Sequence, residues 1–143
     1  MVQGLAALGQ ALGATALDRL ARYCDLLQQW NQRVNLTAIT ETTDVYLKHF
    51  LDSLTLLPLL PAGAATLIDV GTGGGFPGLP LAIARPDVQV TLLEAHARKT
   101  TFLTAVVAEL ALDNVAVVTG RAEEVGQDAA HREQYDVSVT RAV

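Results

Sequence analysis

The sequence contains one cysteine, Cys24, among its 143 residues, so it cannot form an internal disulfide. A single free thiol fits a protein of a reducing compartment. No apolar stretch reaches the length of a membrane-spanning helix without a charge or a helix breaker, and the first residues lack the basic segment and apolar run of an export signal. We therefore expect a soluble cytoplasmic protein without a membrane partner.

Basic residues are also scarce. Ten Lys and Arg stand against 15 Asp and Glu, which gives a net charge of −5. This balance argues against a surface coated in phosphate-binding side chains, although it allows a local basic patch. Half of the residues are hydrophobic, so the chain has enough apolar material for the core of one domain.

The first part of the sequence has a helical pattern, because apolar residues recur at spacings of about three and four. Gly13 interrupts this pattern, which predicts a short helix and then a longer one over about residues 16–31, with Cys24 on its buried face. A polar, ordered loop should follow over residues 31–43, and a further helix should run from about 44 to 60. Residues 1–62 therefore form an N-terminal helical region.

From residue 66 the pattern changes to alternating strands and helices, which predicts a parallel α/β sheet with right-handed crossovers over residues 63–143. The sequence ends just after the fourth strand. The first strand of a doubly wound sheet is central, so we expect an incomplete sheet and a truncated protein. The predicted strands are 66–70, 88–93, 115–119 and 135–140, and the predicted helices are 78–84, 98–110 and 122–125.

The most informative segment joins the first predicted strand to the first helix. Asp69 ends an apolar run, and Gly71, Gly73 and Gly75 follow at alternate positions, where the lack of a Cβ lets a ligand approach the backbone. The dinucleotide-binding pattern G-x-G-x-x-G has no acid two residues before its first glycine, and Phe76 stands where its third glycine would be. The segment instead resembles the signature of class I methyltransferases, which bind S-adenosylmethionine. The alternative is that Asp69 only caps the turn.

Acidic residues follow the second and third predicted strands as well. Glu94 lies near the spacing of the acid that holds ribose hydroxyls in Rossmann folds; alternatively, it is a solvated acid at a strand end. Ala122 and Glu123 follow the third strand, where a backbone N–H and a carboxylate can meet an adenine. The alternative is a helix start, where the dipole favours acids.

Arg141 follows the fourth predicted strand, where class I methyltransferases usually hold the methyl acceptor. The sequence has neither the Asn/Asp-Pro-Pro-aromatic tetrad of enzymes that methylate exocyclic amines nor a cysteine nucleophile in this region. A guanidinium suits a phosphate, a base edge or a carboxylate. We assign no general base and no metal ligands. His49, in the N-terminal region, is either a functional donor or a structural helix residue, and the pattern favours the structural role.

Four segments together, 31–39, 49–54, 69–78 and 140–142, resemble the RsmG family of bacteria, also called GidB. The glycine motif followed by Phe-Pro-Gly is the most specific of them. The resemblance implies a Rossmann-like class I S-adenosylmethionine-dependent methyltransferase fold with an N-terminal helical extension. It also implies methylation of nitrogen 7 of one guanine in the decoding-region loop of 16S rRNA, in free RNA or in a precursor of the small ribosomal subunit, by an enzyme we expect to be monomeric at full length.

The resemblance and the motif together suggest which residues touch the cofactor and the RNA. Guanine nitrogen 7 has a free lone pair, so its methylation requires alignment with the methyl donor rather than a base. The cofactor-binding candidates are Asp69, Gly71, Gly73, Phe76, Glu94, Ala122, Glu123 and Arg141. The RNA-binding candidates are Arg33, Lys48, Arg98, Lys99 and Arg141.

Other classes of function stay open on sequence alone. A methyltransferase for a small molecule or a protein would have the same cofactor half and would fit the acidic net charge better. A nicotinamide-dependent oxidoreductase is disfavoured by Asp69 and Phe76. A cofactor-binding fragment without catalysis would fit an incomplete sheet.

Overall fold

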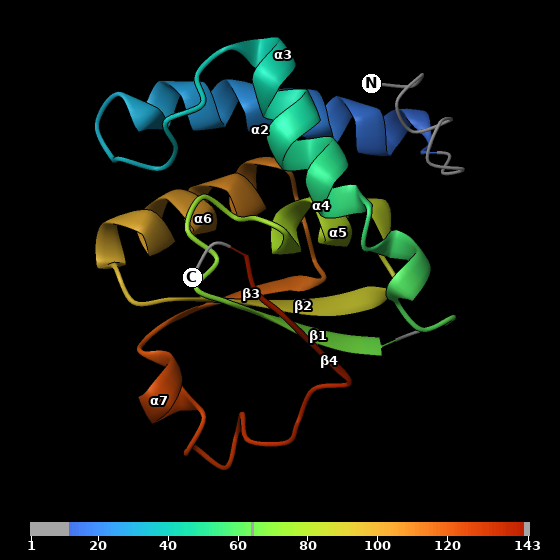
Figure 1. Cartoon of the computed structure of the whole chain (residues 1–143), viewed down its shortest axis with the longest axis vertical. Coiled ribbons are helices and arrows are strands. Elements are labelled where there is room, and N and C mark those ends of the chain that lie inside the picture. The colour runs from blue at the N-terminus through green and yellow to red at the C-terminus, as the bar shows by residue number, and fades with distance from the viewer. Residues whose placement is uncertain (1–11, 64, 142–143) are drawn as a thin grey trace.

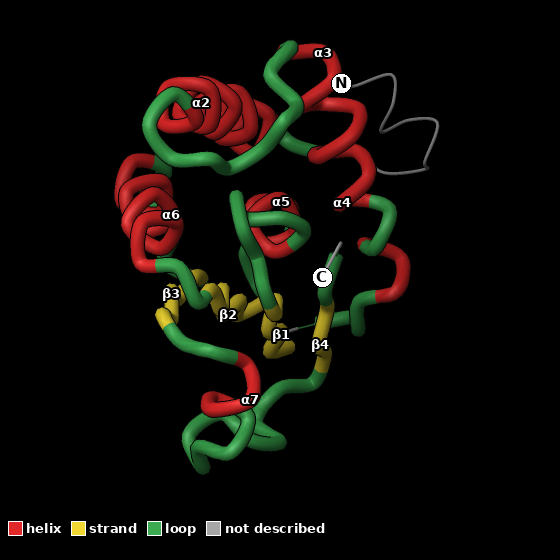
Figure 2. The backbone as a smooth tube through the Cα atoms, turned by 60° about the vertical axis from the view of Figure 1, so that its left-hand side comes forward, coloured by secondary structure: helices red, strands yellow, loops and turns green. Residues whose placement is uncertain are grey.

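The computed structural model describes residues 12–63 and 65–141, and in them a parallel four-stranded sheet lies between helices on one face and a thinner cover on the other (Figures 1 and 2). The strand order is β3-β2-β1-β4, which is part of the order seen in doubly wound nucleotide-binding folds. The predicted parallel α/β class is confirmed. The strands are β1 (Ala65–Val70), β2 (Val88–Glu94), β3 (Val115–Thr119) and β4 (Val137–Val139).

Helices cover the two faces of the sheet unequally. Helices α5 (Gly78–Ala84) and α6 (Ala97–Glu109) pack on one face, and α2 (Ala14–Asn31) lies over them (Figure 2). Among the described residues, the short α7 (Ala122–Val125) and the loops beside it are all that lies under the opposite face. The remaining helical segment leads from α2 back to β1 and consists of α3 (Thr42–Asp44), the π-helical η1 (Val45–Leu51), α4 (Asp52–Leu54) and the 3₁₀ turn η2 (Leu57–Leu59).

Helix α2 forms because one face of it is apolar. Leu20, Tyr23, Cys24 and Leu27 recur at helical spacing and are all buried, which confirms the prediction that Cys24 belongs to the core. The helix begins directly after Gly13, close to its predicted start. The shorter helix expected before Gly13 lies outside the described residues.

The loop after α2 is ordered, as predicted, because the last residue of the helix organises it. The Asn31 side chain accepts hydrogen bonds from the backbone N–H groups of Leu36 and Thr37 at 2.9 and 3.0 Å, and it donates to the Thr37 carbonyl at 2.9 Å. These bonds fold the loop back along the end of α2 and bring Leu36 and Thr37 toward the sheet.

The helix predicted to run to residue 60 is helical only to Leu54. The chain then makes a turn at residues 55–56 before η2. Pro58 explains the break, because it has no N–H to continue the helical hydrogen bonds. Earlier in the segment, residues 45–51 adopt the wider π-helical geometry, which is uncommon and often found at functional sites.

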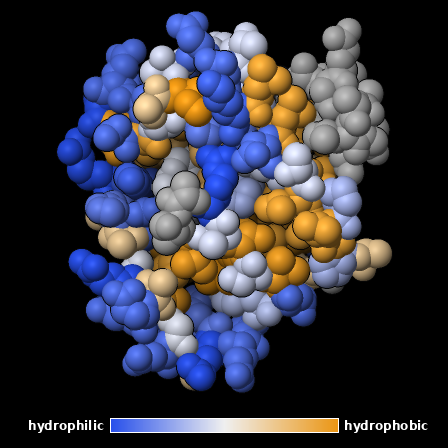
Figure 3. Space-filling model, viewed as in Figure 1, coloured by the Kyte–Doolittle hydropathy of each residue, from blue (hydrophilic) through white to orange (hydrophobic). Residues whose placement is uncertain are grey.

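Strand β4 lies beside β1, as predicted, with Val137 opposite Leu67 and Val139 opposite Asp69. It is shorter than the predicted 135–140, since only residues 137–139 pair with β1. Figure 3 shows apolar side chains gathered over β4 and the segment between α4 and β1, where Leu59 is 77% exposed.

One hydrophobic core joins the N-terminal helices to the sheet. Tyr23 and Phe50, from the N-terminal region, lie in the same buried cluster as Phe76 and Leu79 from the sheet region. The two predicted regions therefore share their interior. None of the described helices is long and apolar enough to cross a membrane.

Candidate cofactor and nucleic-acid site

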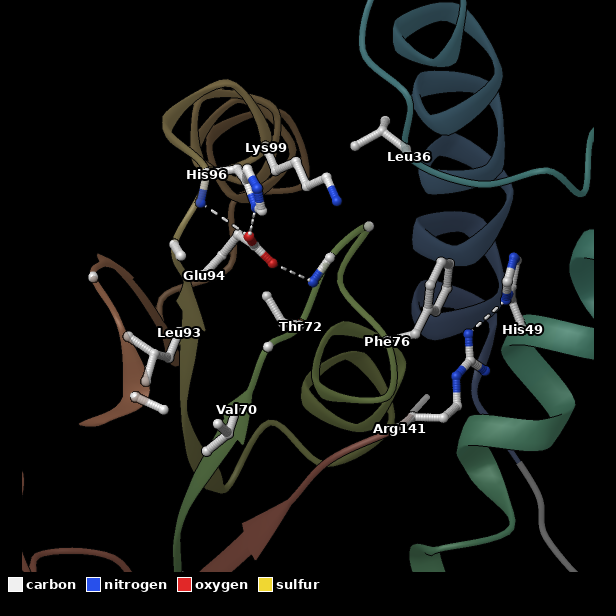
Figure 4. A pocket seen from close by; sticks show the side chains of 16 residues that line it. Leu36, His49, Val70, Thr72, Phe76, Leu93, Glu94, His96, Lys99 and Arg141 are labelled. Atoms are coloured by element: carbon white, nitrogen blue, oxygen red, sulfur yellow. Dashed lines mark hydrogen bonds and ion pairs between the residues drawn. The ribbon is translucent and has the colours of Figure 1, made fainter. Parts of the chain in front are cut away.

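A pocket of about 450 Å³ opens at the carboxyl ends of β1, β2 and β3 (Figure 4). This is the edge of a parallel sheet where Rossmann-like folds bind their ligands. Most of the predicted cofactor-binding residues line the pocket, while Asp69 and Glu123 do not. The predicted residues that line it are Gly71, Gly73, Phe76, Glu94, Ala122 and Arg141.

The turn after β1 forms the wall of the pocket nearest the sheet. Gly71 and Gly73 have φ values of +68° and +58°, a region that side chains with a Cβ rarely adopt. The N–H groups of Gly71 and Thr72 both donate to the Leu93 carbonyl at 3.0 Å, which fixes the turn over the end of β2. A Cβ at Gly73 would meet no protein atom within 4 Å, so it would project into open space at the pocket wall.

Asp69 lies beneath this turn rather than in the pocket. Its Oδ2 accepts hydrogen bonds from the Thr72 hydroxyl at 2.6 Å and from the Gly78 N–H at 2.8 Å, so it ties the turn to the start of α5. Burial raises the pKa of Asp69 to about 7, although the two hydrogen bonds and the charge of Arg141 act in the opposite direction. This position matches the turn-capping role that the sequence left open for Asp69.

Glu94, at the end of β2, points toward the glycine turn (Figure 4). Its Oε1 accepts a hydrogen bond from the Gly73 N–H at 2.9 Å, and its Oε2 accepts from the His96 N–H at 3.0 Å and contacts the His96 ring at 2.8 Å. Burial alone would raise the pKa of Glu94, but the bonds from His96 and Gly73 outweigh it and hold the pKa below its usual value. The pocket therefore carries a fixed negative charge beside the turn.

Arg141 forms the opposite wall of the pocket with residues of the N-terminal region. Its guanidinium donates to His49 Nδ1 at 2.7 Å, to the Lys48 carbonyl at 3.3 Å and to Asp52 Oδ2 at 3.2 Å. The guanidinium carbon also lies 5.1 Å from the centre of the Phe76 ring, a cation–π distance. The end of β4 and the helical segment from η1 to α4 thus build this wall together.

His49 is a pocket residue that the sequence pattern assigned to a structural role. Its ring stacks on Phe76 with centroids 4.2 Å apart and an angle of 11° between the planes. His49 and Asp52 are three residues apart, a spacing that places two polar side chains on the same face of a helix. That spacing is the signal that could have indicated a joint role for them.

Ala122 and Glu123 begin helix α7 at the far side of the pocket. Ala122 lines the pocket, whereas the Glu123 side chain is exposed in the first turn of the helix. Other lining residues were not among the predicted ones, although Thr72, Gly74 and Ala95 directly adjoin predicted residues in the sequence. Leu36 had no such signal, because it reaches the pocket only through the fold of the loop after α2.

The five basic RNA-binding candidates form two groups, and one member of each, Lys99 and Arg141, lines the pocket. Lys99 lines the pocket and Arg98 precedes it in the first turn of α6; Arg98 donates to the Arg33 carbonyl at 2.8 Å. Arg33 in turn lies 5.0 Å from the Trp30 ring centre, and Trp30, Arg33 and Arg98 line a neighbouring groove of about 220 Å³. The second group is Lys48 and Arg141. No cluster of metal-ligating side chains occurs among the residues that the structure describes.

Solved structures show which class of protein has this fold. The chain is similar to a putative S-adenosyl-L-methionine-dependent methyltransferase from Methanococcus maripaludis, with a TM-score of 0.58 at 15% identity over 83% of this chain and 48% of that one. It is also similar to a putative protein-L-isoaspartate O-methyltransferase from Plasmodium falciparum, with a TM-score of 0.57 at 15% identity over 97% of this chain and 70% of that one. The chain therefore has the Rossmann-like fold of methyltransferases, with its pocket at the carboxyl ends of the strands.

Within that class, the chain belongs to the GidB family, described as rRNA small subunit methyltransferase G, whose model matches residues 16–143. It is 51% identical over 139 residues to ribosomal RNA small subunit methyltransferase G of Neisseria gonorrhoeae, covering 97% of this chain and 64% of that protein. It is 43% identical to the protein of the same name from Acetivibrio thermocellus, covering 100% of this chain and 59% of that protein. The family predicted from the sequence motifs is confirmed, and the chain spans about three fifths of the length of these relatives.

Proposed function

We propose that the pocket binds S-adenosylmethionine and that the chain takes part in methylating nitrogen 7 of a guanine in 16S rRNA. The observation that carries the proposal is the joint geometry of the glycine turn and Glu94 in the pocket of a GidB-family chain. A carboxylate fixed beside close-approach glycines suits a ligand that carries both hydroxyls and positive charge.

Different pocket residues contact different parts of the proposed ligand. The backbone at Gly71 and Gly73, which both line the pocket, meets the methionine part, because no Cβ holds the ligand away. Glu94 accepts hydrogen bonds from the ribose hydroxyls, and Ala122 with Glu123 meets the adenine. Arg141 pairs with a carboxylate or a base edge. Asp69 supports the turn from below. The bound ligand supplies an electrophilic methyl group on its sulfonium.

A nucleophile that needs no deprotonation fits this pocket. Both ring nitrogens of His49 are engaged, by Thr37 and by Arg141. Both oxygens of Glu94 accept hydrogen bonds from the protein. Guanine nitrogen 7 has a lone pair ready to attack, so the protein has only to align it with the methyl group. This agreement supports nitrogen 7 over an exocyclic amine as the acceptor.

The same proposal covers the partner and the place of action. The basic groups around the pocket suit an RNA backbone, although the chain as a whole is acidic. We propose 16S rRNA, free or in a precursor of the small ribosomal subunit, as the partner of an enzyme that is monomeric at full length and acts in the cytoplasm.

The direct test is methyl transfer from labelled S-adenosylmethionine to small-subunit RNA, with borohydride and aniline cleavage to locate 7-methylguanine. Calorimetry with S-adenosylhomocysteine and with NAD runs in parallel on the same chain. We expect binding of S-adenosylhomocysteine and no binding of NAD. Label on a protein or a metabolite instead of RNA would favour the other methyltransferase classes, and no binding of S-adenosylhomocysteine would refute the cofactor assignment.

The RNA contact has its own prediction. Changing Arg33, Lys48 or Arg98 to Gln should weaken RNA binding and lower the slope of its salt dependence by about one unit each, because each change removes one phosphate contact. The matched control is Arg22→Gln, since Arg22 pairs with Glu109 at the opposite end of α6. Slopes equal to that of the control in all three variants would contradict the assignment.

A further inference from the structure

Arg141 is held mainly by side chains and carbonyls of one helical segment. Its Nη1 donates to the Lys48 carbonyl and to Asp52 Oδ2, and its Nη2 donates to His49 Nδ1. A guanidinium has five N–H groups. Three of them are used in this way, which leaves two without a partner among the described residues to serve an acceptor in the pocket.

The contact with Arg141 sets the protonation of His49. A guanidinium can only donate, so His49 Nδ1 must be the acceptor and the ring proton must reside on Nε2. Nε2 lies 2.8 Å from the Thr37 hydroxyl, which can accept that proton's hydrogen bond. The Thr37 hydroxyl also accepts the Ile39 N–H at 3.0 Å, so its position is fixed by the loop. Only one neutral tautomer of His49 satisfies both neighbours.

The stack on Phe76 fixes the plane of the same ring. With centroids 4.2 Å apart and nearly parallel planes, the imidazole has little freedom to rotate away from Arg141. His49 is only 7% exposed, so water cannot readily replace either partner. Thr37, Phe76 and Arg141 come from three different parts of the chain and meet only at this ring.

We propose that His49 is a positioning residue: its Nε2-protonated tautomer, fixed by Thr37 and Phe76, holds the Arg141 guanidinium at the wall of the cofactor pocket. This inference rests on the proposed function, because it assigns the Arg141 guanidinium to the bound cofactor. His49 itself neither touches the reacting atoms nor moves a proton.

The electrostatics of the site agree with this role. Burial and the charge of Arg141 lower the pKa of His49 to about 4, while Asp52 acts in the opposite direction. The charged groups that face His49 are Arg141 from the end of β4 and Asp52 on its own helical segment, and the neighbours Thr37 and Phe76 are uncharged. Protonation of His49 would set two cations against each other, so Arg141 should lose this partner in acid.

The test compares four variants by calorimetry with S-adenosylhomocysteine and by thermal unfolding. His49→Phe keeps a ring on Phe76 and removes both hydrogen bonds, whereas His49→Asn places an oxygen near the position of Nδ1 and keeps the acceptor for Arg141. We expect His49→Phe and Arg141→Ala each to lose roughly tenfold in affinity. The double variant should lose no more than either single one, and His49→Asn should recover most of the loss.

Independent losses that multiply in the double variant would overturn the proposal, as would wild-type affinity in His49→Phe. If His49→Phe fails to fold, His49→Asn and His49→Gln decide the matter, because Gln reaches the Nε2 position and cannot replace Nδ1. Equal affinity in these two variants would contradict the role.

A second readout needs no cofactor and separates this inference from the cofactor assignment. The ¹⁵N NMR shifts of the His49 ring report its tautomer and its pKa in the unliganded protein. Arg141→Ala should raise the pKa of His49 by about 1 unit or more. The ring should then no longer favour the tautomer with its proton on Nε2. An unchanged tautomer and pKa would refute the coupling even if S-adenosylhomocysteine binds, whereas a shifted pKa without cofactor binding would leave the coupling intact and refute the proposed function.

Discussion

At the scale of single residues, the pocket depends on Gly73, Glu94 and Asp69, which form or support the glycine turn. Gly73 needs a positive φ and also faces open space at the pocket wall. Glu94 binds the turn with one oxygen and faces the pocket. Asp69, two residues before the first glycine of the motif, supports the same turn from the buried side.

Gly73→Ala should lose most of the affinity for the cofactor. The added methyl group occupies space at the pocket wall, and the positive φ adds a backbone cost of about 1 kcal/mol. Gly63→Ala is the matched control, because Gly63 has a φ of +85° with nothing within 4 Å and lies away from the pocket. Both variants should lose similar stability in urea unfolding. Only Gly73→Ala should lose affinity in calorimetry with S-adenosylhomocysteine, and equal affinities would remove Gly73 from the site.

Glu94→Gln should weaken binding of S-adenosylhomocysteine about tenfold. The amide keeps the shape of the side chain and one oxygen for the Gly73 N–H, but its NH2 cannot accept from the His96 N–H. The variant also loses charge-assisted hydrogen bonds worth roughly 1.5–3 kcal/mol. Glu109→Gln at the far end of α6 serves as the control for loss of one negative charge. A loss below twofold would remove Glu94 from the cofactor contacts and leave it the structural role of holding the glycine turn.

The sequence predicted that the glycine turn and Glu94 lie together at one edge of the sheet, because their positions follow from spacing along the chain. It could not separate the two roles of Asp69, since both place an acid at the end of β1 and differ only in the direction of the carboxylate. The position of His49 at the pocket was still harder to predict. Its partners Thr37, Phe76 and Arg141 are brought together only by the tertiary fold.

At the scale of elements, helix α2 acts on the glycine turn through one buried side chain. The Tyr23 hydroxyl donates to the Gly74 carbonyl, and the Tyr23 ring stacks on Phe50 and Phe76. Gly75 is needed beside it, because a Cβ there would lie 2.5 Å from the Tyr23 oxygen. The N-terminal region thus shapes the turn that the sheet region supplies.

Tyr23→Phe should lower the free energy of unfolding by about 1–3 kcal/mol, because the Gly74 carbonyl loses its partner in a buried place. The ring and its stacking stay. Tyr46→Phe is the control: Tyr46 packs edge-on against Phe50 at 5.0 Å, and its hydroxyl bonds to none of the described residues. Urea unfolding checks the difference, and equal stabilities would show that the bond to Gly74 contributes nothing.

The elements were predictable where one periodicity dominates. The positions of β1, β2, α2 and α6 were predicted to within about two residues. Buried apolar runs indicated the two strands, and helical spacing indicated the two helices. The segment from 42 to 59 was less predictable. Its apolar spacing reads as one helix, while a π-helical turn and Pro58 divide it.

At the scale of the whole molecule, two buried groups make opposite contributions to the pH dependence of stability. Asp69 has a raised pKa of about 7 against an ordinary 3.8, so the folded state holds more protons and stability falls as pH rises from about 4 to 7. His49 has a lowered pKa of about 4 against an ordinary 6.5, so stability rises over about pH 4 to 6.5. The two slopes largely cancel over the shared range.

Asp69→Asn should expose the contribution of His49. The variant keeps an oxygen for Thr72 and Gly78 but no longer titrates, so its stability should rise with pH between about 4.5 and 6.5 relative to the parent chain. The difference approaches at most about 1.4 kcal/mol per pH unit. Urea unfolding at several pH values measures it, and parallel curves for the two proteins would show that Asp69 titrates normally.

The contacts of Arg141 also indicate at which stage of folding the pocket can form. They join residues 89 to 93 positions apart, and the β1–β4 pairing beside them spans about 70. The hydrogen bonds within α2 and α6 and the pairing of β1 with β2 join residues much nearer in the sequence, so these elements can form before the long loops close, whereas the docking of α2 on α6 spans separations similar to those of the Arg141 contacts. The cofactor wall is then among the last parts of the molecule to assemble. A ligand that requires this wall binds only the finished fold, and its binding energy stabilises the whole chain against unfolding.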